Sequence, residues 1–161
     1  MTTIVTERLS LDPLRVEDAE AMAPVLGDER LHEFIGGDPL SAAELRKRYE
    51  ALTAGSGDPA VRWLNWIVRL RADEIPIGTV QATVADHTAT IAWVIGMGWQ
   101  NQGFASEAAW ALIDWLQAEG VDTIEARVHP DHVASAKVAA KAGLSPTDEV
   151  VDGERVWRLQ H

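Results

Sequence analysis

The sequence predicts a mixed α/β domain, in which a central, mostly antiparallel twisted sheet is flanked by helices. Three segments in the middle of the chain, residues 63–70, 76–85 and 89–95, are rich in β-branched and aromatic side chains. Short polar turns join them, which favours an antiparallel meander. Helical patterns precede this meander and alternate with strands after it. This order of elements excludes a doubly wound parallel sheet.

The first part of the chain predicts a strand and two helices. Residues 7–14 alternate apolar and polar side chains, as in a half-buried strand. Apolar residues at helical spacing follow over residues 16–26. A capping-box pattern at residues 41–44 begins a second helix through about Leu52. Between the two helices, residues 29–40 are expected to form a loop.

The last third of the chain predicts two more helices and three strands. An alanine-rich helix follows Gly103 and carries one apolar stripe, so it should pack against the sheet. A strand at residues 123–128 and a short helix ending at Gly143 come next. An Asp-Gly turn then joins two final strands, residues 145–151 and 155–159.

Length and composition indicate one hydrophobic core. The chain has 161 residues, 47% of them hydrophobic, and no proline-, glycine- or serine-rich linker. We therefore expect residues 1–161 to form a single domain. The first residues lack the pattern of a signal peptide, and no apolar run approaches the roughly 20 residues of a membrane span. We expect a soluble, cytoplasmic protein with no membrane partner.

The charge and the absence of cysteine exclude several classes of function. With 14 Lys and Arg against 25 Asp and Glu, the net charge of −11 argues against a nucleic-acid partner. It permits a cationic substrate, although acidity also serves solubility alone. The lack of cysteine excludes disulfides, a thiol nucleophile and thiolate metal ligands. The histidines show no metal-binding spacing, so no metal is predicted.

The segment at residues 100–105, Gln-Asn-Gln-Gly-Phe-Ala, predicts an anion cradle between a strand and a helix. A loop glycine before a helix start directs unpaired backbone N–H groups to one place, where the helix dipole adds positive charge. A pyrophosphate fits such a cradle, although Gly103 could also be an ordinary loop hinge. No lysine follows Gly103, which argues against the phosphate loop of a nucleotide triphosphatase.

These residues resemble the Gcn5-related N-acetyltransferase (GNAT) superfamily, whose signature is Gln/Arg-x-x-Gly-x-Gly/Ala at a strand-to-helix junction. The resemblance extends over nearly the whole chain, from Thr6-Glu7-Arg8-Leu9 to the segment from Ser135 to Leu144. Within the superfamily, the chain looks like the RimJ/RimL-like branch. The resemblance implies the GNAT acyl-CoA N-acyltransferase fold, with its fourth and fifth strands splayed apart, and acetyl-CoA as co-substrate.

The resemblance also implies where acetyl-CoA binds. The pantetheine arm is expected to pair with backbone groups of Val94 and Ile95 in the wedge between the splayed strands, as an added strand would. The pyrophosphate is expected at the cradle. The implied cofactor-binding residues are Val94, Ile95, Gln100, Asn101, Gln102, Gly103, Phe104, Ala105, Ser106, His132 and Ser135.

The leaving thiolate needs a proton donor, and the usual one is absent. Many members of the superfamily use a tyrosine on the helix after the fifth strand, where this chain has Ala139. The branch often carries a serine one turn earlier, which is Ser135 here, and usually an asparagine where this chain has His132. We therefore expect Ser135 and His132 to act on the thiolate side. Alternatively, the Ser135 hydroxyl bonds its own helix backbone.

The base that deprotonates the amine is also substituted. Relatives place a glutamate where this chain has Thr90, which accepts no proton at neutral pH. Glu33 is the candidate catalytic base in the expected loop, and a water chain is a further route, because positioning supplies much of the acceleration. The other candidates are Asp86, His87, Glu125 and His129.

Together these features predict an acetyl-CoA-dependent N-acetyltransferase that transfers the acetyl group directly to a primary amine. The amine belongs either to a protein or peptide N-terminus or to a small molecule. Trp93 or Trp99 could line the acceptor pocket, although both fit the core as well. The alternative function is a GNAT-fold module that binds acyl-CoA with little or no catalysis. A homodimer is common in the resembled branch.

Overall fold

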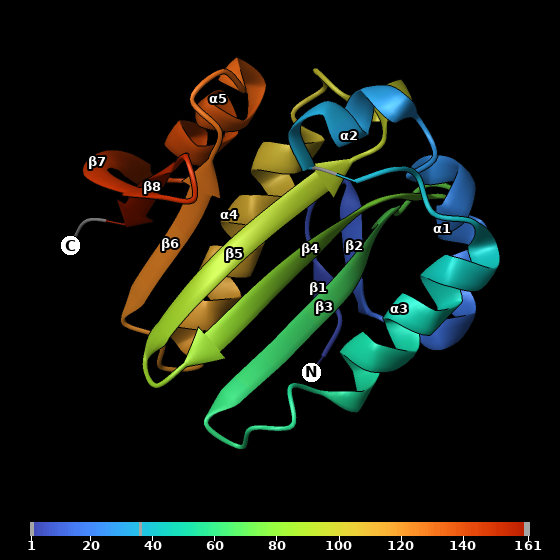
Figure 1. Ribbon diagram of the computed structural model, residues 1–161, viewed down its shortest axis with the longest axis horizontal. Helices are drawn as coiled ribbons and strands as arrows, with labels where there is room; N and C mark the ends of the chain where they lie inside the picture. Colours follow the sequence, from blue (N-terminus) through green and yellow to red (C-terminus); the bar gives the residue numbers. More distant parts are fainter. Residues whose placement is uncertain (1, 36, 160–161) are drawn as a thin grey trace.

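The computed structural model describes residues 2–35 and 37–159, and the strands in this part of the chain form one sheet (Figure 1). Their order across the sheet is β1-β2-β3-β4-β5-β6-β8-β7. Every neighbouring pair is antiparallel except β5 and β6. The strands are β1 (Ile4–Val5), β2 (Leu9–Pro13), β3 (Val61–Leu70), β4 (Pro76–Ala85), β5 (Thr88–Ile95), β6 (Thr123–Val128), β7 (Leu144–Val151) and β8 (Glu154–Leu159). The predicted mixed α/β fold with a mostly antiparallel sheet is confirmed.

Helices cover both faces of this sheet. The α-helices are α1 (Ala19–Val25), α2 (Glu29–Ile35), α3 (Ala42–Ala54), α4 (Phe104–Ala118) and α5 (Val133–Lys141), with short 3-10 turns at Val16–Asp18 and Met97–Trp99. Alternate residues of β3 show how the faces are divided. Trp66 belongs to the large core under α4, whereas Ile67 packs with Met22 of α1 and Leu45 of α3. Because successive side chains of a strand point to opposite faces, α1 and α3 lie across the sheet from α4.

Helix α4 packs through the stripe that the sequence predicts. Phe104, Ala108 and Leu112 are buried against the sheet. Trp115 meets Trp66 edge to face, with ring centroids 5.2 Å apart and planes at 77°. Trp110, which falls off the stripe, is 58% exposed.

The capping box predicted at residues 41–44 begins α3. Ser41 Oγ accepts a hydrogen bond from the Glu44 backbone N–H at 3.1 Å. The Glu44 carboxylate in turn accepts one from the Ser41 backbone N–H at 3.0 Å. Two of the helix's otherwise unpaired N–H groups are thereby satisfied, which fixes the start of α3.

The sheet splays between β5 and β6. The parallel pairing runs only from Thr88 opposite Thr123 to Ile91 opposite Ala126. Residues 92–95 of β5 continue without a partner on β6, although they remain paired with β4. The edge of β5 that faces β6 therefore has backbone groups free for a ligand at this end, as the resemblance implied for a pantetheine arm.

Two expectations about the elements before the central strands were wrong. Residues 29–40 were expected as a loop, yet they contain α2, while Gly36 lies outside the described residues. The first predicted strand begins at Leu9, and β1 precedes it. Helix α2 spans only seven residues, too short for a helical hydrophobic period to be visible in sequence.

One finding bears on membranes. Among the helices of residues 2–35 and 37–159, none combines the length and the apolar character needed to cross a bilayer.

Candidate active site

Two cavities lie on either side of the splayed end of β5. One has a volume of about 830 Å³ and extends over the sheet face beneath α3. The other, of about 670 Å³, lies between the segment that follows β5 and the helices α4 and α5. We call them the acceptor cavity and the donor cavity. The residues that line both are Trp93, Val94, His132 and Ser135.

The donor cavity contains the cradle expected at residues 100–105. Gly103, the residue before α4, has φ +83°, and Asn101 has φ +63°. These left-handed conformations turn the chain sharply, so that the first N–H groups of α4 are left open toward the cavity. The conformation explains why a glycine stands at position 103.

The cofactor-binding residues implied by the resemblance gather around this cavity with one exception. Gln102 does not line the donor cavity; its backbone carbonyl instead accepts a hydrogen bond from Arg8 Nη1 at 3.0 Å. The Gln100 side chain turns back and donates from Nε2 to the Ile95 carbonyl at 2.9 Å, which ties the loop to the end of β5. The lining residues from the implied set are Val94, Ile95, Gln100, Asn101, Gly103, Phe104, Ala105, Ser106, His132 and Ser135.

Arg8 and Thr6 brace the cradle from the first strands. Arg8 Nε donates to the Glu107 carboxylate at 2.7 Å, and Thr6 donates its hydroxyl to the same group. The Arg8 guanidinium also lies 4.3 Å from the centre of the Phe104 ring. Burial raises the pKa of Glu107, but hydrogen bonds from Thr6 and Arg8 outweigh it and bring the pKa below its usual value. This interaction gives the Thr-Glu-Arg-Leu segment a structural role.

Three cationic side chains line the donor cavity. Lys137 and Lys141, on successive turns of α5, line the donor cavity, and so does Arg30 of α2. Arg30 is held by Asp28 at 2.6 Å. Sequence reasoning missed these residues because an exposed lysine is common on any helix. The helical spacing of Lys137 and Lys141 was the available signal.

Ser135 and His132 lie where the two cavities meet. Ser135 Oγ is 3.4 Å from His132 Nε2, a long but feasible hydrogen-bond separation. Burial, and secondarily the nearby His129, lowers the pKa of His132 below 6.5, so the imidazole is mostly neutral at neutral pH. Ala139, at the usual tyrosine position, is fully buried. The polar groups at the start of α5 are those of Ser135 and of His132, the residue before the helix.

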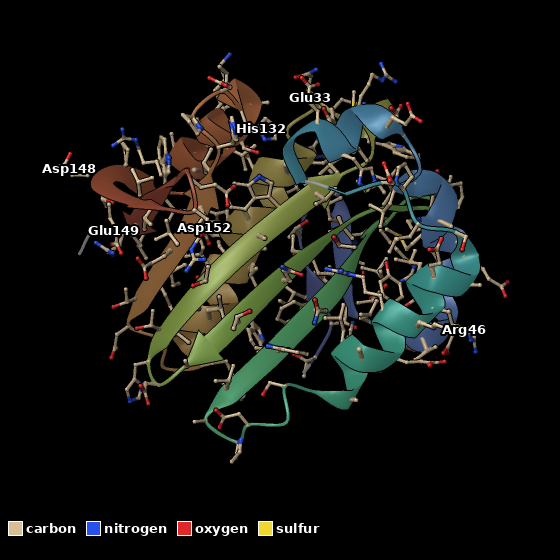
Figure 2. All side chains as sticks on the ribbon, in the orientation of Figure 1. Glu33, Arg46, His132, Asp148, Glu149 and Asp152 are labelled. Atoms are coloured by element: carbon tan, nitrogen blue, oxygen red, sulfur yellow. The ribbon has the colours of Figure 1, made fainter. Side chains whose placement is uncertain are left out.

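The candidate bases occupy different places. Glu33 is an exposed residue of α2 that lines the donor cavity, and Figure 2 shows its side chain pointing away from the strands. Asp86 and His87 form the turn between β4 and β5, at the end of β5 remote from the splay, and line neither cavity. Glu125 is paired with Arg158 at 2.6 Å. His129 lines the acceptor cavity. Glu33 does not line that cavity, so its carboxylate does not lie where the base expected from the sequence would act on an amine there.

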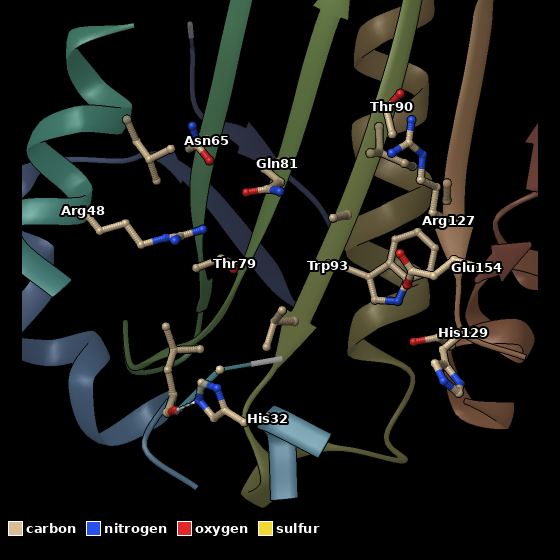
Figure 3. Close-up of a pocket in the computed structure, with 18 of the residues that line it drawn as sticks. His32, Arg48, Asn65, Thr79, Gln81, Thr90, Trp93, Arg127, His129 and Glu154 are labelled. Atoms are coloured by element: carbon tan, nitrogen blue, oxygen red, sulfur yellow. Dashed lines mark hydrogen bonds between the residues drawn. The ribbon is translucent and has the colours of Figure 1, made fainter. Parts of the chain in front are cut away.

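The acceptor cavity has an apolar side and a polar floor (Figure 3). Leucines from α1, α3 and the segments beside them, including Leu26, Leu45 and Leu52, supply the apolar side. Trp93 lines this cavity as well as the donor cavity, whereas Trp99 lines only the latter. The polar residues of the sheet that line it are Asn65, Thr79, Gln81 and Thr90.

Several charged residues of the acceptor cavity were not predicted. Arg48 comes from α3, Arg127 from β6 and Glu154 from the first residue of β8. No local motif marks them, because the cavity joins segments that are distant in sequence. Their shared position is visible only when α3, the sheet and the final hairpin are assembled.

Comparison with known proteins gives a family and a fold. A family model described as "Acetyltransferase (GNAT) domain" matches residues 8–145. The chain is also similar to a Bacillus licheniformis protein described as "Uncharacterized N-acetyltransferase p20". The two are 29% identical over 143 residues, which cover 86% of this chain and 79% of that protein.

Solved structures share the fold at lower identity. A GNAT-family acetyltransferase from Bacillus anthracis superposes with a TM-score of 0.81 at 21% identity, covering 98% of this chain and 97% of that one. Mycobacterium smegmatis RimJ, solved with CoA-disulfide, gives a TM-score of 0.78 at 20% identity, covering 94% of this chain and 81% of that one.

Proposed function

Because this chain belongs to the GNAT family of acetyltransferases, we propose that its donor cavity binds acetyl-CoA and its acceptor cavity binds a primary amine. The chain is an acyltransferase, and its family transfers acyl groups from acyl-CoA to amines. In our proposal the acetyl group passes directly from the thioester to the amine. No enzyme thiol takes part, since the chain has no cysteine.

The observation that carries this proposal is the set of residues common to both cavities. Trp93, Val94, His132 and Ser135 line each of them, at the point where β5 leaves β6. A thioester held along the free edge of β5 and an amine entering from the acceptor cavity would therefore meet there. Holding the two reactants side by side makes the transfer effectively unimolecular, which lowers the entropic part of its barrier.

The donor cavity has the chemistry that acetyl-CoA requires. Free N–H groups at the start of α4 suit a pyrophosphate, and Lys137 and Lys141 add positive charge on the opposite wall. The unpaired edge of residues 92–95 offers backbone groups to the amides of the pantetheine arm. The backbone N–H of Ile95, which faces this open edge, would also stabilise the charge that develops on the thioester oxygen, whereas the N–H of Val94 faces β4.

We assign the thiolate side of the reaction to Ser135 and His132. The Ser135 hydroxyl can donate a hydrogen bond or proton to the departing sulfur. Before the reaction, the neutral imidazole of His132, 3.4 Å away, can accept a hydrogen bond from this hydroxyl and hold it in place. The hydroxyl then turns its one proton toward the departing sulfur, and the proton that the attacking amine loses restores it. Together they would replace the tyrosine whose usual position is taken by Ala139.

The amine acceptor is a peptide or protein N-terminus, or a small molecule. A cavity of about 830 Å³ falls within the range of small-molecule pockets and is also open enough for the end of a chain. A solved structure of the same fold, described as a ribosomal L7/L12 alpha-N-protein acetyltransferase, makes a protein N-terminus one candidate to test. A homodimer and a cytoplasmic location stay predictions.

The test combines binding and turnover in one preparation. Calorimetric titration with acetyl-CoA and with CoA measures binding, and thiol release against a panel of peptides and small amines measures transfer. We expect both ligands to bind and at least one amine to release thiol. Binding without thiol release from any amine would instead support the acyl-CoA-binding module. Absence of binding would refute the assignment of the donor cavity.

A further inference from the structure

We propose that the acceptor cavity recognises an elongated primary amine that also carries a carboxylate. Arg48 of α3 binds the carboxylate, and Glu154 of β8 binds the ammonium group. This inference rests on the proposed function and adds to it the chemical class of the acceptor.

The Arg48 side chain points into the acceptor cavity and has no hydrogen-bond or ion-pair partner among the described residues. It lines the acceptor cavity, and Figure 3 shows its side chain extending from α3 toward the strands. No hydrogen bond or ion pair engages its guanidinium within residues 2–35 and 37–159. A guanidinium binds a carboxylate through paired hydrogen bonds, so this position is suited to an anionic group.

Tyr49, the next residue of α3, closes the wall beside Arg48. Its side chain lines the cavity but is only 3% exposed, and its hydroxyl oxygen is buried without a hydrogen-bond partner among the described residues. Burial, and then the negative charge of Asp18, raises the pKa of Tyr49 to about 12, so the phenol keeps its proton. A ligand in the cavity does not reach this buried hydroxyl, so the charge at this end of the cavity comes from Arg48.

Glu154 lies on the opposite wall. The antiparallel register that places Val128 opposite Arg155 brings Glu154 beside the end of β6, where the sheet splays. In Figure 3 its side chain extends toward the indole of Trp93, and both residues line the acceptor cavity. Its carboxylate forms no ion pair within the described residues. Near the reaction point, an unpaired carboxylate suits the ammonium form of the entering amine.

The floor between these walls determines the length of the acceptor. Strand β3, next to α3, and strand β6, next to β8, are separated by β4 and β5. Three spacings of about 4.8 Å come to roughly 14 Å where the strands are paired, and the splay between β5 and β6 widens this separation at the end near Glu154. Side chains shorten this gap, but the two charges of the acceptor must still be several bonds apart. The polar side chains of Asn65, Thr79 and Gln81 along the floor can bond the connecting chain.

The other charged residues of the acceptor cavity do not neutralise Arg48 or Glu154. Arg127 lies on the same wall as Glu154, while Asp38 and Asp152 line the cavity rim as exposed residues. Arg127 and Glu154 are not within ion-pair distance of each other. The cation on the α3 wall and the anion on the β8 wall are thus both available to a ligand.

The experiment uses a series of ω-amino acids of increasing chain length, each paired with the n-alkylamine of the same length. Acetylation is followed by thiol release in the wild type and in Arg48→Gln, Tyr49→Phe and Glu154→Gln. A hydrogen bond to a charged group contributes enough to change kcat/KM about tenfold or more. We expect the wild type to prefer a long ω-amino acid over its alkylamine by that factor. Arg48→Gln should bring the preference close to one.

The remaining variants separate the two ends of the cavity. Tyr49→Phe, which removes a buried hydroxyl that the ligand does not reach, should leave the preference unchanged, whereas Glu154→Gln should lower kcat/KM about tenfold for both kinds of amine. Arg46→Gln, on the solvent side of α3, and Asp148→Asn, at the outer edge of the final hairpin, make the same charge changes outside the cavity (Figure 2). Both controls should behave as wild type. Affinity for CoA, which all variants should retain, verifies the fold.

Two outcomes would overturn this proposal while leaving the proposed function in place. One is turnover of amines without any preference for the ω-amino acids, and the other is a preference that survives Arg48→Gln. Thiol release from no amine at all, peptides included, despite binding of CoA, would refute the proposed transfer itself. The two failures are therefore distinct.

Discussion

Arg8 and Glu107 join the bend between β1 and β2 to the first turn of α4, with Arg8 Nε 2.7 Å from Glu107 Oε1. The same guanidinium reaches the carbonyl of Gln102 and stacks over Phe104, so a single side chain contacts both sides of Gly103. Its charge is neutralised by Glu107, which argues for a supporting role and not for direct phosphate binding. The geometry of the cradle thus depends on a residue far upstream.

Replacing Arg8 with glutamine should weaken CoA binding without removing the binding groups themselves. The loss frees Gln102 and the start of α4, so we expect Kd for CoA to rise several-fold and Tm to fall by a few degrees. Calorimetry and thermal unfolding measure the two effects. Arg62→Gln, an exposed residue on β3, is the matched control and should change neither. An unchanged Kd in Arg8→Gln would mean that the cradle holds its shape alone.

Gly103→Val should abolish measurable binding of acetyl-CoA. The backbone there has φ +83°, which a β-branched residue rarely adopts, and an added Cβ would lie 3.3 Å from Arg8 Nη2. Gly98→Ala is the control, because Gly98 has open space around its Cβ position and no positive φ. Circular dichroism checks that both variants fold. Wild-type affinity in Gly103→Val would contradict the position of the pyrophosphate.

Ser135→Ala should reduce the turnover number more than it reduces the affinity for acetyl-CoA. The hydroxyl is proposed to act on the departing sulfur, and general acid catalysis of this kind contributes about 10²- to 10⁴-fold. Steady-state kinetics beside calorimetric Kd values separates the two effects. Ser145→Ala, at an exposed position on β7, serves as the control. Equal kinetics in Ser135→Ala and wild type would leave Ser135 as a structural residue.

The pH profile of kcat/KM should show an acid limb, because His132 becomes protonated there. Its pKa lies below 6.5 because burial disfavours the charged ring. As the pH falls through that lowered pKa, the imidazole gains a proton and can no longer accept a hydrogen bond from Ser135. We expect kcat/KM to decrease there, and His132→Gln to lack this limb. The same shift makes the folded state less stable as the pH falls below 6.5, since the unfolded chain binds that proton more readily.

Ser41→Ala should destabilise the protein without affecting the donor cavity. It removes the side-chain acceptor of the capping box, for which the typical loss is about 1 kcal/mol. Chemical denaturation measures the change in unfolding free energy, and calorimetry should give wild-type affinity for CoA. Ser56→Ala is the comparison, because it removes a hydroxyl that hydrogen-bonds in the loop after α3 and not at a helix cap. Weaker CoA binding in Ser41→Ala would show that α3 and the donor cavity are coupled.

Local signals in the sequence predicted much of the fold and the donor side of the site. The capping box at Ser41 and the glycine at position 103 each depend on neighbours within a few residues, so both can be recognised in the sequence alone. The same is true of the central meander, whose turns are short.

The acceptor side could not be predicted in this way. Arg48 and Glu154 approach one cavity only because α3 covers β3 while β8 pairs with β6. Each is unremarkable in its own segment, and their relation depends on the whole sheet. Helix α2 escaped prediction for a local reason, since seven residues are too few to display a helical period.

The two cavities draw on different parts of the chain, and this separation has a consequence for how the enzyme can change. Most of the donor wall comes from residues 93–141, whereas α3 and the floor strands β3 and β4 contribute to the acceptor wall alone. Substitutions at Arg48, Asn65 or Gln81 can therefore accumulate without loss of acyl-donor binding. Randomised libraries confined to those elements, selected for growth on new amines, should yield altered specificity at little cost to the shared chemistry.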